Sequence, residues 1–188
     1  MRTFILLLAG TTALTSCTAQ ENSDGLVASA GTKAASAHEI NWLSFEEAVA
    51  LHEKAPKKLI IDVYTHWCGW CKKMDKTTFV DPDVVSEING NFYAVKLDAE
   101  RKDDVSFRDK VFVFKPEYKA HELAIGLLQG KMSYPSYVFL DESFAMISPI
   151  PGYKTKKEMM QLLGFFSNDA YKTKTWEDYL AGAAGATK

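Results

Sequence analysis

Two cysteines separated by two residues directly follow an apolar run, and this junction constrains the fold more than any other stretch of the sequence. The run, residues 59–64, is too short and too rich in β-branched residues for a helix, so it predicts a buried strand. Residues 69–74 have the composition and spacing of a helix. Cys68 and Cys71 are therefore predicted to lie where a strand passes into a helix.

A cysteine at the first turn of a helix is favoured as a thiolate. Backbone N–H groups there lack partners within the helix, and the helix dipole adds a positive potential. Cys68 is therefore the predicted nucleophile and the more exposed thiol of the pair. Cys71 lies one turn further along the same face, so it is the predicted resolving thiol that attacks a mixed disulfide formed by Cys68.

The same cysteine spacing also occurs in half of a zinc site and in structural disulfides. A zinc site needs two more ligands, but the third cysteine is Cys17 in the N-terminal leader and the four histidines are scattered. The sequence therefore predicts no metal site and no cofactor beyond a redox-active disulfide between Cys68 and Cys71. A structural disulfide remains an alternative.

With these residues identified, the chain resembles the thioredoxin superfamily, and more closely its thioredoxin-like bacterial envelope lipoproteins with a WCGWCK active-site motif. The resemblance extends over residues 42–168, with an insertion. It implies an α/β thioredoxin-like fold in which a central mixed β-sheet is flanked by helices. The matching residues are Asp62, Trp67, Cys68, Gly69, Cys71, Lys72, Lys96, Tyr134, Pro135 and Gly152.

Asp62 is the one charged residue of the predicted buried strand. Burial disfavours the charged form, so its pKa should be raised. The resemblance implies that Asp62 accepts and returns the proton of Cys71, and that Lys96 neighbours this acid. The alternatives are an Asp62 that only bonds a nearby backbone group or lysine, and a Lys96 that is simply solvated.

The resemblance also implies a substrate platform. Tyr134-Pro135 matches the cis-proline loop that faces the cysteines, where the backbone of Tyr134 would pair with an extended substrate segment. Trp67, Gly69 and Trp70 complete the predicted substrate-binding residues. Alternatively, Pro135 marks the start of an edge strand.

The N-terminus predicts export. Residues 1–16 combine a basic start with an apolar segment that is too short to span a bilayer, as in a signal peptide. Residues 14–17 resemble a bacterial lipobox, so Cys17 is the predicted lipidation site; the alternative is an ordinary signal peptide. Residues 17–39 are mostly small and polar and predict a flexible tether. A lipid-anchored protein of the cell envelope follows, on the periplasmic face of a membrane or on the cell surface.

Residues 40–180 are long enough for one domain with its own core. Capping-box and breaker signals predict helices at 45–54, 82–88, 155–167 and 176–180, and alternation predicts strands at 59–64, 92–98, 136–141 and 144–150. An insertion at about 101–132 is expected to hold a β-hairpin and a helix opened by Pro116, which cover a sheet edge or shape the substrate groove. Residues 181–188 are predicted to be a disordered tail.

The 22 basic and 24 acidic residues give a net charge of −2 and form no basic stripe, so the sequence predicts protein or thiol partners and no nucleic acid. The predicted function is a thiol–disulfide oxidoreductase that reduces disulfides of cell-envelope proteins, because the resemblance assigns Asp62 to the acid of reductive thioredoxins. A reductase outside the cytoplasm implies a membrane thiol electron donor. A disulfide oxidase or isomerase is an alternative, since Gly69-Trp70 replaces the typical Gly-Pro. A binding module with a structural disulfide is the non-enzymatic alternative.

Overall fold

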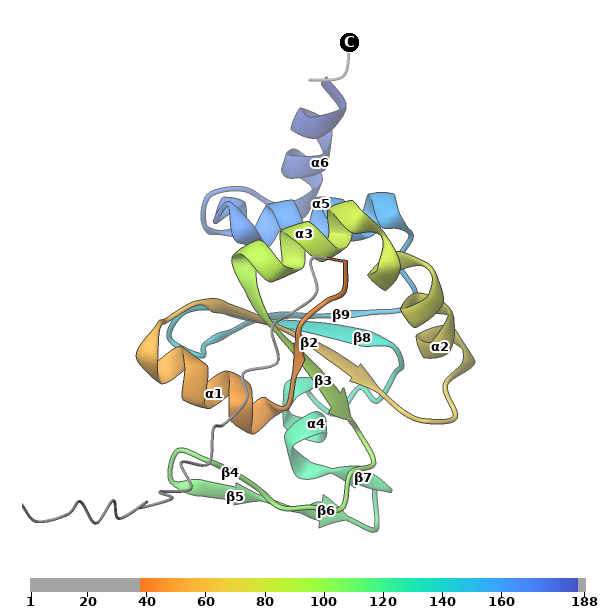
Figure 1. Ribbon diagram of the computed structural model, residues 1–188, viewed down its shortest axis with the longest axis vertical. Helices are drawn as coiled ribbons and strands as arrows, with labels where there is room; N and C mark the ends of the chain where they lie inside the picture. The colour runs from red at the N-terminus through yellow and green to blue at the C-terminus, as the bar shows by residue number, and fades with distance from the viewer. Residues whose placement is uncertain (1–37, 186–188) are drawn as a thin grey trace, which may run out of the picture. The chain divides into compact units, whose positions relative to one another are not determined.

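The computed structural model describes residues 38–185 (Figure 1). The predicted signal peptide, the lipidation site Cys17 and nearly all of the predicted tether lie outside the described residues. Within residues 38–185, no helix is both long enough and apolar enough to cross a membrane.

A five-stranded mixed sheet forms the centre of the domain, in the order β1-β3-β2-β8-β9. Its central strand β2 runs parallel to β3 and antiparallel to β8. The first six of the seven residues of β2 are buried, which confirms the prediction of a strand covered on both faces. The strands are β1 (Trp42–Leu43), β2 (Lys58–Tyr64), β3 (Phe92–Asp98), β8 (Ser136–Leu140) and β9 (Met146–Pro151).

Helices cover both faces of this sheet (Figure 1). On one face, α2 (Gly69–Lys76), α3 (Pro82–Asn91) and α5 (Lys156–Ser167) pack on Ile60 and Phe139. On the other face, α1 (Phe45–Lys54) and α4 (Glu122–Leu127) pack on Ile61 and Val138. Adjacent residues of β2 thus enter opposite cores, as the pleat of a strand requires. The predicted α/β thioredoxin-like architecture is confirmed.

The predicted helix starts agree closely with the structure. Ser44 and Thr155 each form a complete capping box, with Glu47 and Glu158 respectively. Asp81 caps α3, which continues to Asn91 rather than ending near Ile88. A short 3₁₀ turn, η1 (Thr78–Val80), links α2 to α3.

The insertion differs in part from its prediction. The expected hairpin is present as β4 (Val105–Phe107) and β5 (Lys110–Phe112), with Arg108 in the left-handed region at φ 54°. The prediction that Pro116 opens a helix was wrong. A second hairpin, β6 (Phe114–Lys115) with β7 (Ala120–His121), encloses that segment, and α4 begins only at Glu122.

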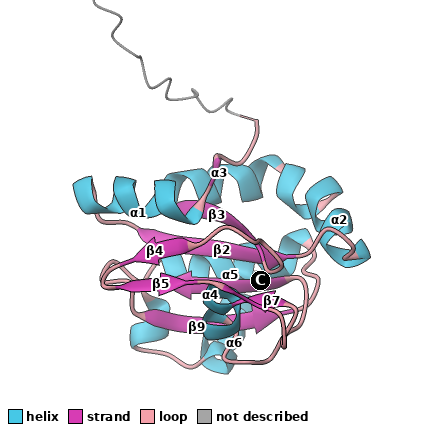
Figure 2. Cartoon of the chain, turned by 90° about the horizontal axis from the view of Figure 1, so that it is seen from below, coloured by secondary structure: helices cyan, strands magenta, loops and turns pink. Residues whose placement is uncertain are grey.

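Local hydrogen bonding explains this difference. The backbone N–H of Lys119 turns back to the carbonyl of Pro116, and Lys119 itself has φ 49°, so the backbone reverses instead of continuing as a helix. His121 then caps α4 by accepting the N–H of Leu123 through Nδ1. Leu123 and Val105 belong to the same core as Phe45 of α1 and Ile61 of β2. The insertion, with α4, β4 and β5, therefore lies over a face of the sheet and not along its edge (Figure 2).

The C-terminal prediction also needs correction. The helix α6 runs over Trp176–Gly185, so the prediction of a disordered tail was wrong for residues 181–185. Alanine, the strongest helix former, is frequent there and continues the helix. Trp176 and Tyr179 attach α6 to α5 through Phe165, with ring centroids 5.2 and 5.1 Å apart. Residues 186–188 lie outside the described residues.

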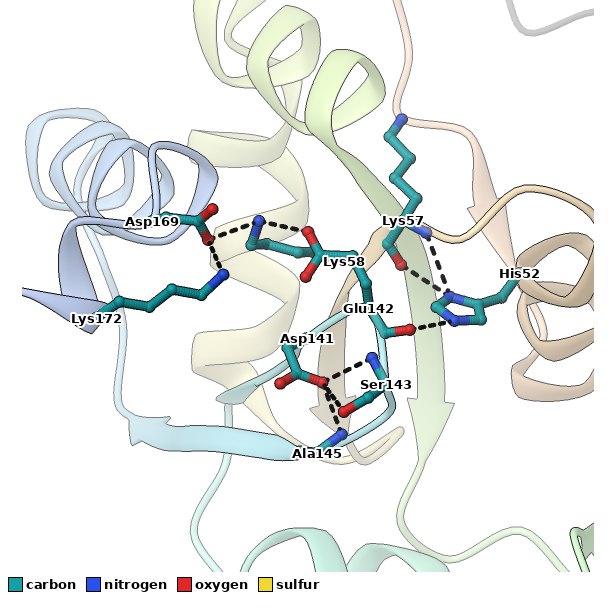
Figure 3. Close-up of polar contacts among 9 residues, drawn as sticks. All are labelled: His52, Lys57, Lys58, Asp141, Glu142, Ser143, Ala145, Asp169 and Lys172. Carbon is teal, nitrogen blue, oxygen red and sulfur yellow. Dashed lines mark hydrogen bonds and ion pairs between the residues drawn. The ribbon is translucent and has the colours of Figure 1, made fainter.

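Polar contacts fasten the end of the sheet where β2 begins, away from the cysteines (Figure 3). The buried Nζ of Lys58 lies 2.6 Å from Glu142 and 2.9 Å from Asp169. His52 bridges the carbonyls of Lys57 and Glu142, at 2.9 Å each. These contacts join α1, β2, the β8–β9 turn and the segment after α5, which leaves the opposite end of β2 to carry the site.

Candidate active site

The two cysteines of the motif form a disulfide at the start of α2. Cys68 is the N-cap residue, and its Sγ accepts the backbone N–H of Cys71 at 3.0 Å. A free N–H at a helix N-terminus is therefore directed at the sulfur of Cys68. This contact favours a thiolate at Cys68 when the disulfide is reduced.

The exposure of the cysteines differs from the prediction. Cys68 was expected to be exposed, but only 5% of it is accessible, compared with 2% of Cys71. Cys68 is the more exposed of the two cysteines, as predicted, although both residues are buried. The accessible groups are instead Trp67, 66% exposed, and Trp70, 56% exposed. Trp67 directly precedes Cys68 and Trp70 directly precedes Cys71, so each cysteine of the motif follows an exposed aromatic residue.

Trp67 links the motif to the loop before β8. Its ring meets that of Tyr134 edge-on at 5.8 Å, and its Nε1 donates to Glu100 at 3.0 Å. The Tyr134–Pro135 peptide bond is cis, as predicted. The alternative of an edge strand is wrong, because β8 pairs with β2 on one side and β9 on the other. The loop and the motif are thus brought together as the resemblance implied.

Trp70 has a different set of neighbours. Its ring lies 5.5 Å from that of Tyr153, and the Nζ of Lys73 sits 4.8 Å from the Trp70 ring and 5.1 Å from the Tyr153 ring. Tyr153 was not predicted as a site residue. The signal that could have found it is the preceding Gly152, whose φ of 87° turns the chain toward the motif.

Asp62 is buried on the face of β2 that is covered by α2. Its side chain is 1% exposed, its Oδ2 lies 2.6 Å from the Nζ of Lys96, and its Oδ1 has no hydrogen-bond partner. Burial raises the pKa of Asp62 to about 6, the pairing with Lys96 opposes that rise, and Asp75 adds to it. The expectation of a buried acid with a raised pKa is met.

Lys96 is not a solvated strand lysine. Its Nζ contacts both Asp62 and Asp75, and its side chain is 22% exposed. Burial lowers the pKa of Lys96, but the two carboxylates outweigh that effect and the net shift is upward. Lys96 therefore stays charged at every pH at which Asp62 titrates.

Asp75 is a site residue that the sequence analysis missed. It lies on α2 four residues after Cys71, and its side chain is 43% exposed. With Lys96, Trp42 and Phe79 it lines a pocket of about 310 Å³ that opens to solvent. A chain of charged groups thus runs from the buried Asp62 through Lys96 to Asp75 at the surface. The position i+4 from the second cysteine was the available signal.

The part of the chain that the structure describes holds no group of three or more His, Cys, Asp or Glu residues placed to bind a metal ion.

Comparison with known proteins identifies the family. Residues 26–178 match the family model Thioredox_DsbH, described as a protein of unknown function, DUF255. The chain belongs to this family. The assignment to the thioredoxin superfamily is thereby confirmed, together with the α/β fold.

Curated relatives match over shorter stretches. The thiol:disulfide interchange protein DsbD of Vibrio vulnificus (strain CMCP6) is 34% identical over 61 residues, which are 32% of this chain and 10% of DsbD. The uncharacterized protein B0495.5 of Caenorhabditis elegans is 30% identical over 129 residues, which are 67% of this chain and 16% of that protein. The chain spans only a tenth to a sixth of the length of these relatives.

Solved structures agree with the fold. A thioredoxin-fold protein from Helicobacter pylori superimposes with a TM-score of 0.52 at 15% identity, covering 77% of this chain and 84% of its own. The solution structure of a candidate disulphide-isomerase from Bacteroides thetaiotaomicron has a TM-score of 0.50 at 26% identity, covering 70% and 95%.

Proposed function

We propose that this protein is a thiol–disulfide oxidoreductase that reduces disulfides of cell-envelope proteins. The observation that carries the proposal is the Cys68–Cys71 disulfide at the N-terminus of α2, the helix that covers the sheet face on which the buried Asp62 has its pKa raised to about 6. Acids with a perturbed pKa cluster at catalytic sites. The name of the relative DsbD, a thiol:disulfide interchange protein, supports the same chemistry.

The reaction begins from the dithiol form. The Cys68 thiolate attacks one sulfur of a client disulfide, which forms a mixed disulfide and releases the other client sulfur as a thiolate. Cys71 then loses its proton and attacks Cys68 in the mixed disulfide. The client leaves as a dithiol, and the Cys68–Cys71 disulfide of the present structure is the oxidised product. Two electrons pass from the protein to the client.

Asp62 is the proposed proton acceptor for Cys71 in the second step. Its ionised form predominates above its pKa of about 6, so it can take a proton at neutral pH. Lys96 holds the ionised form through its contact with Oδ2. The unpartnered Oδ1 remains free to receive the proton.

The proposed client-binding surface surrounds the disulfide. Trp67 and Trp70 are exposed on its two sides, and Gly69 between the cysteines leaves open space, since a Cβ added there would meet nothing within 4 Å. An extended client segment would pair with the backbone of Tyr134 and pass over Pro135.

The physiological context is proposed from the N-terminal sequence and the reaction. Lipidation of Cys17 would anchor the protein in a membrane of the cell envelope, and a second acyl chain would make that anchoring durable. Each turnover leaves a disulfide, so a membrane thiol electron donor must return two electrons to Cys68 and Cys71. The redox-active disulfide is the only cofactor that this cycle requires.

Disulfide isomerisation is the second candidate. The Bacteroides thetaiotaomicron protein, whose title names a disulphide-isomerase, is 26% identical to this chain. Gly69-Trp70 also differs from the Gly-Pro of thioredoxin at the positions that help to set the reduction potential. In an isomerase, Cys68 would attack the client disulfide in the same way. A second thiol of the client, instead of Cys71, would then attack the mixed disulfide and release Cys68.

The reduction potential of the full-length chain tests the proposal. Equilibration with glutathione or dithiothreitol buffers should give a reversible potential near that of thioredoxin, about −270 mV. A value near about −120 mV would identify an oxidant, and one near about −180 mV would favour the isomerase. A disulfide that resists these reductants would support the structural alternative.

The proposed lipid anchor is tested by the variant Cys17→Ser. After fractionation of cells, this variant should no longer be found in the membrane fraction.

A further inference from the structure

The solvent face of α2 carries a row of lysines. Lys72, Lys73 and Lys76 are all exposed, whereas Cys71 before them and Met74 among them are buried. Residues one turn apart share a face of a helix, so Lys72 and Lys76 stand one above the other with Lys73 beside them. Within residues 38–185, none of these three lysines forms an ion pair with a carboxylate, which leaves their charges available to a partner.

The nearest acid on the same helix does not cancel this charge. Asp75 contacts the Nζ of Lys96, which also binds Asp62. Its negative charge is therefore directed toward β3 and the pocket beside Trp42. The outward face of α2 keeps its positive potential.

The lysine row begins at the disulfide. The Nζ of Lys73 lies over the rings of both Trp70 and Tyr153, and such cation–π contacts hold aromatic rings in place. Trp70 remains 56% exposed in this arrangement. The exposed ring of Trp70, a residue of the motif itself, is thus in direct contact with a lysine of the row.

The neighbours of the other tryptophan of the motif carry the opposite charge. Trp67 donates its indole N–H to Glu100, and Asp98 lies 3.2 Å from the exposed ring of His66. Each of the two tryptophans bordering the disulfide is thus held by a charged group of a different sign. A client that docks over the disulfide would meet acids on the side of Trp67 and lysines on the side of Trp70.

We infer that the face of α2 formed by Lys72, Lys73 and Lys76 is a docking surface for an acidic segment of the client protein, next to its reactive disulfide. This inference rests on the proposed function and assigns a class of substrate to it. Complementary charge steers association and fixes the orientation of the complex, and its effect weakens with salt. The continuity of the lysine row with the disulfide favours a protein client over an anionic membrane surface.

Three synthetic peptides with the same internal disulfide provide the test. One has acidic residues on the side of the disulfide that would lie over α2, one has lysines at those positions, and one has serines. The pre-reduced full-length protein is mixed with each peptide, and the second-order rate of peptide thiol release is measured at low and high salt. At low salt the acidic peptide should react about tenfold faster than the basic one, and the ratio should approach unity at high salt.

Two matched double variants locate the effect. Lys72→Gln with Lys76→Gln should abolish most of the preference, and Lys72→Glu with Lys76→Glu should invert it. Lys54→Gln with Lys174→Gln removes the same net charge from exposed sites on α1 and before α6, and should leave the ratio unchanged. Circular dichroism melts verify that all variants are folded.

The outcomes separate this inference from the proposed function. Equal rates for the three peptides in the wild type would overturn the docking surface and leave the oxidoreductase intact. A preference that the control variant also loses would overturn the assignment to α2. Failure to reduce any peptide would overturn both. Binding of the oxidised chain to anionic phosphatidylglycerol vesicles that depends on Lys72 and Lys76, without any peptide preference, would assign the surface to lipid instead.

Discussion

The Nζ of Lys96 lies 2.6 Å from Oδ2 of Asp62, yet this contact does not bring the pKa of Asp62 back to that of an ordinary carboxyl group. The reason is unequal burial: the side chain of Asp62 is 1% exposed and that of Lys96 is 22% exposed. The free energy needed to remove the carboxylate from water is larger than the stabilisation that a single ion pair provides. The pair therefore contains an acid that titrates near pH 6 beside a lysine that stays charged.

This asymmetry predicts how stability depends on pH. The folded pKa of Asp62, about 6, is above the ordinary aspartate value of 3.8, so the folded state binds the proton more tightly than the unfolded chain. Asp62 therefore reduces stability as the pH rises from about 4 to 6, and the full cost, about 3 kcal/mol, is present above pH 6. Asp62→Asn should be more stable than the wild type at pH 8, with the difference vanishing near pH 4.

Urea denaturation of both proteins at pH 4, 6 and 8 measures this difference. Asp109→Asn is the control, because Asp109 is an exposed carboxylate in the β4–β5 turn. If the free energies of unfolding of Asp62→Asn and the wild type differ by the same amount at all three pH values, Asp62 does not titrate in this range.

The same substitution should slow the resolving step. The amide of the Asp62→Asn variant cannot accept the proton of Cys71, so release of the reduced client should be about 100-fold slower at pH 7, within the range of general base catalysis. Attack by Cys68 should change little. Stopped-flow reduction of a peptide disulfide from pH 5 to 9 separates the two steps. Identical pH profiles for wild type and Asp62→Asn would assign Asp62 a structural role only.

Asp75 should tune the acid without replacing it. Its negative charge raises the pKa of Asp62, so Asp75→Asn should lower that pKa below about 6. In a plot of the rate of the resolving step against pH, the fall of the rate on the acidic side should then occur at lower pH. The rate at pH 8 should not change. A movement of this fall to higher pH would contradict the proposed coupling through Lys96.

The sequence predicted the parts of the site that depend on neighbours along the chain. Cys68 and Cys71 follow a β-branched strand, and this local signal was enough to place them at a helix start. The partner Lys96 and the loop at Tyr134 came from the family resemblance. Residues as distant in sequence from the cysteines as these two can be found by matching a family motif. The hydrophobic periodicity of the sequence does not show which distant residues meet in space.

What the sequence could not show depends on tertiary contacts. Tyr153 reaches Trp70 only because β9 and α5 bring it there, and Asp75 matters only because Lys96 crosses from β3. The small exposure of Cys68, 5%, is likewise a property of the folded domain that the local sequence does not predict. Pro116 is a helix-start signal in the sequence, but a short hairpin competes successfully for the same residues.

Alkylation should distinguish the two thiols. The Sγ of Cys68 receives the N–H of Cys71 at a helix N-terminus, so its pKa should be the lower of the two. With limiting iodoacetamide at about pH 6.5, Cys68 of the reduced protein should react at least about tenfold faster than Cys71. Peptide mapping by mass spectrometry gives the ratio. Faster labelling of Cys71 would reverse the assigned roles.

Removal of the resolving thiol should capture the natural clients. In Cys71→Ala the attack by Cys68 remains possible, but the mixed disulfide can no longer be released by an intramolecular thiol. Non-reducing gels of cells that express this variant should show adducts that collapse on treatment with dithiothreitol. The double variant Cys68→Ala with Cys71→Ala is the control and should show none. Because Cys71 is 2% exposed, alanine leaves a small buried space but no exposed apolar surface, and the variant should stay folded. If the folded, membrane-associated variant forms no adducts, the disulfide is structural and the exchange reaction is wrong.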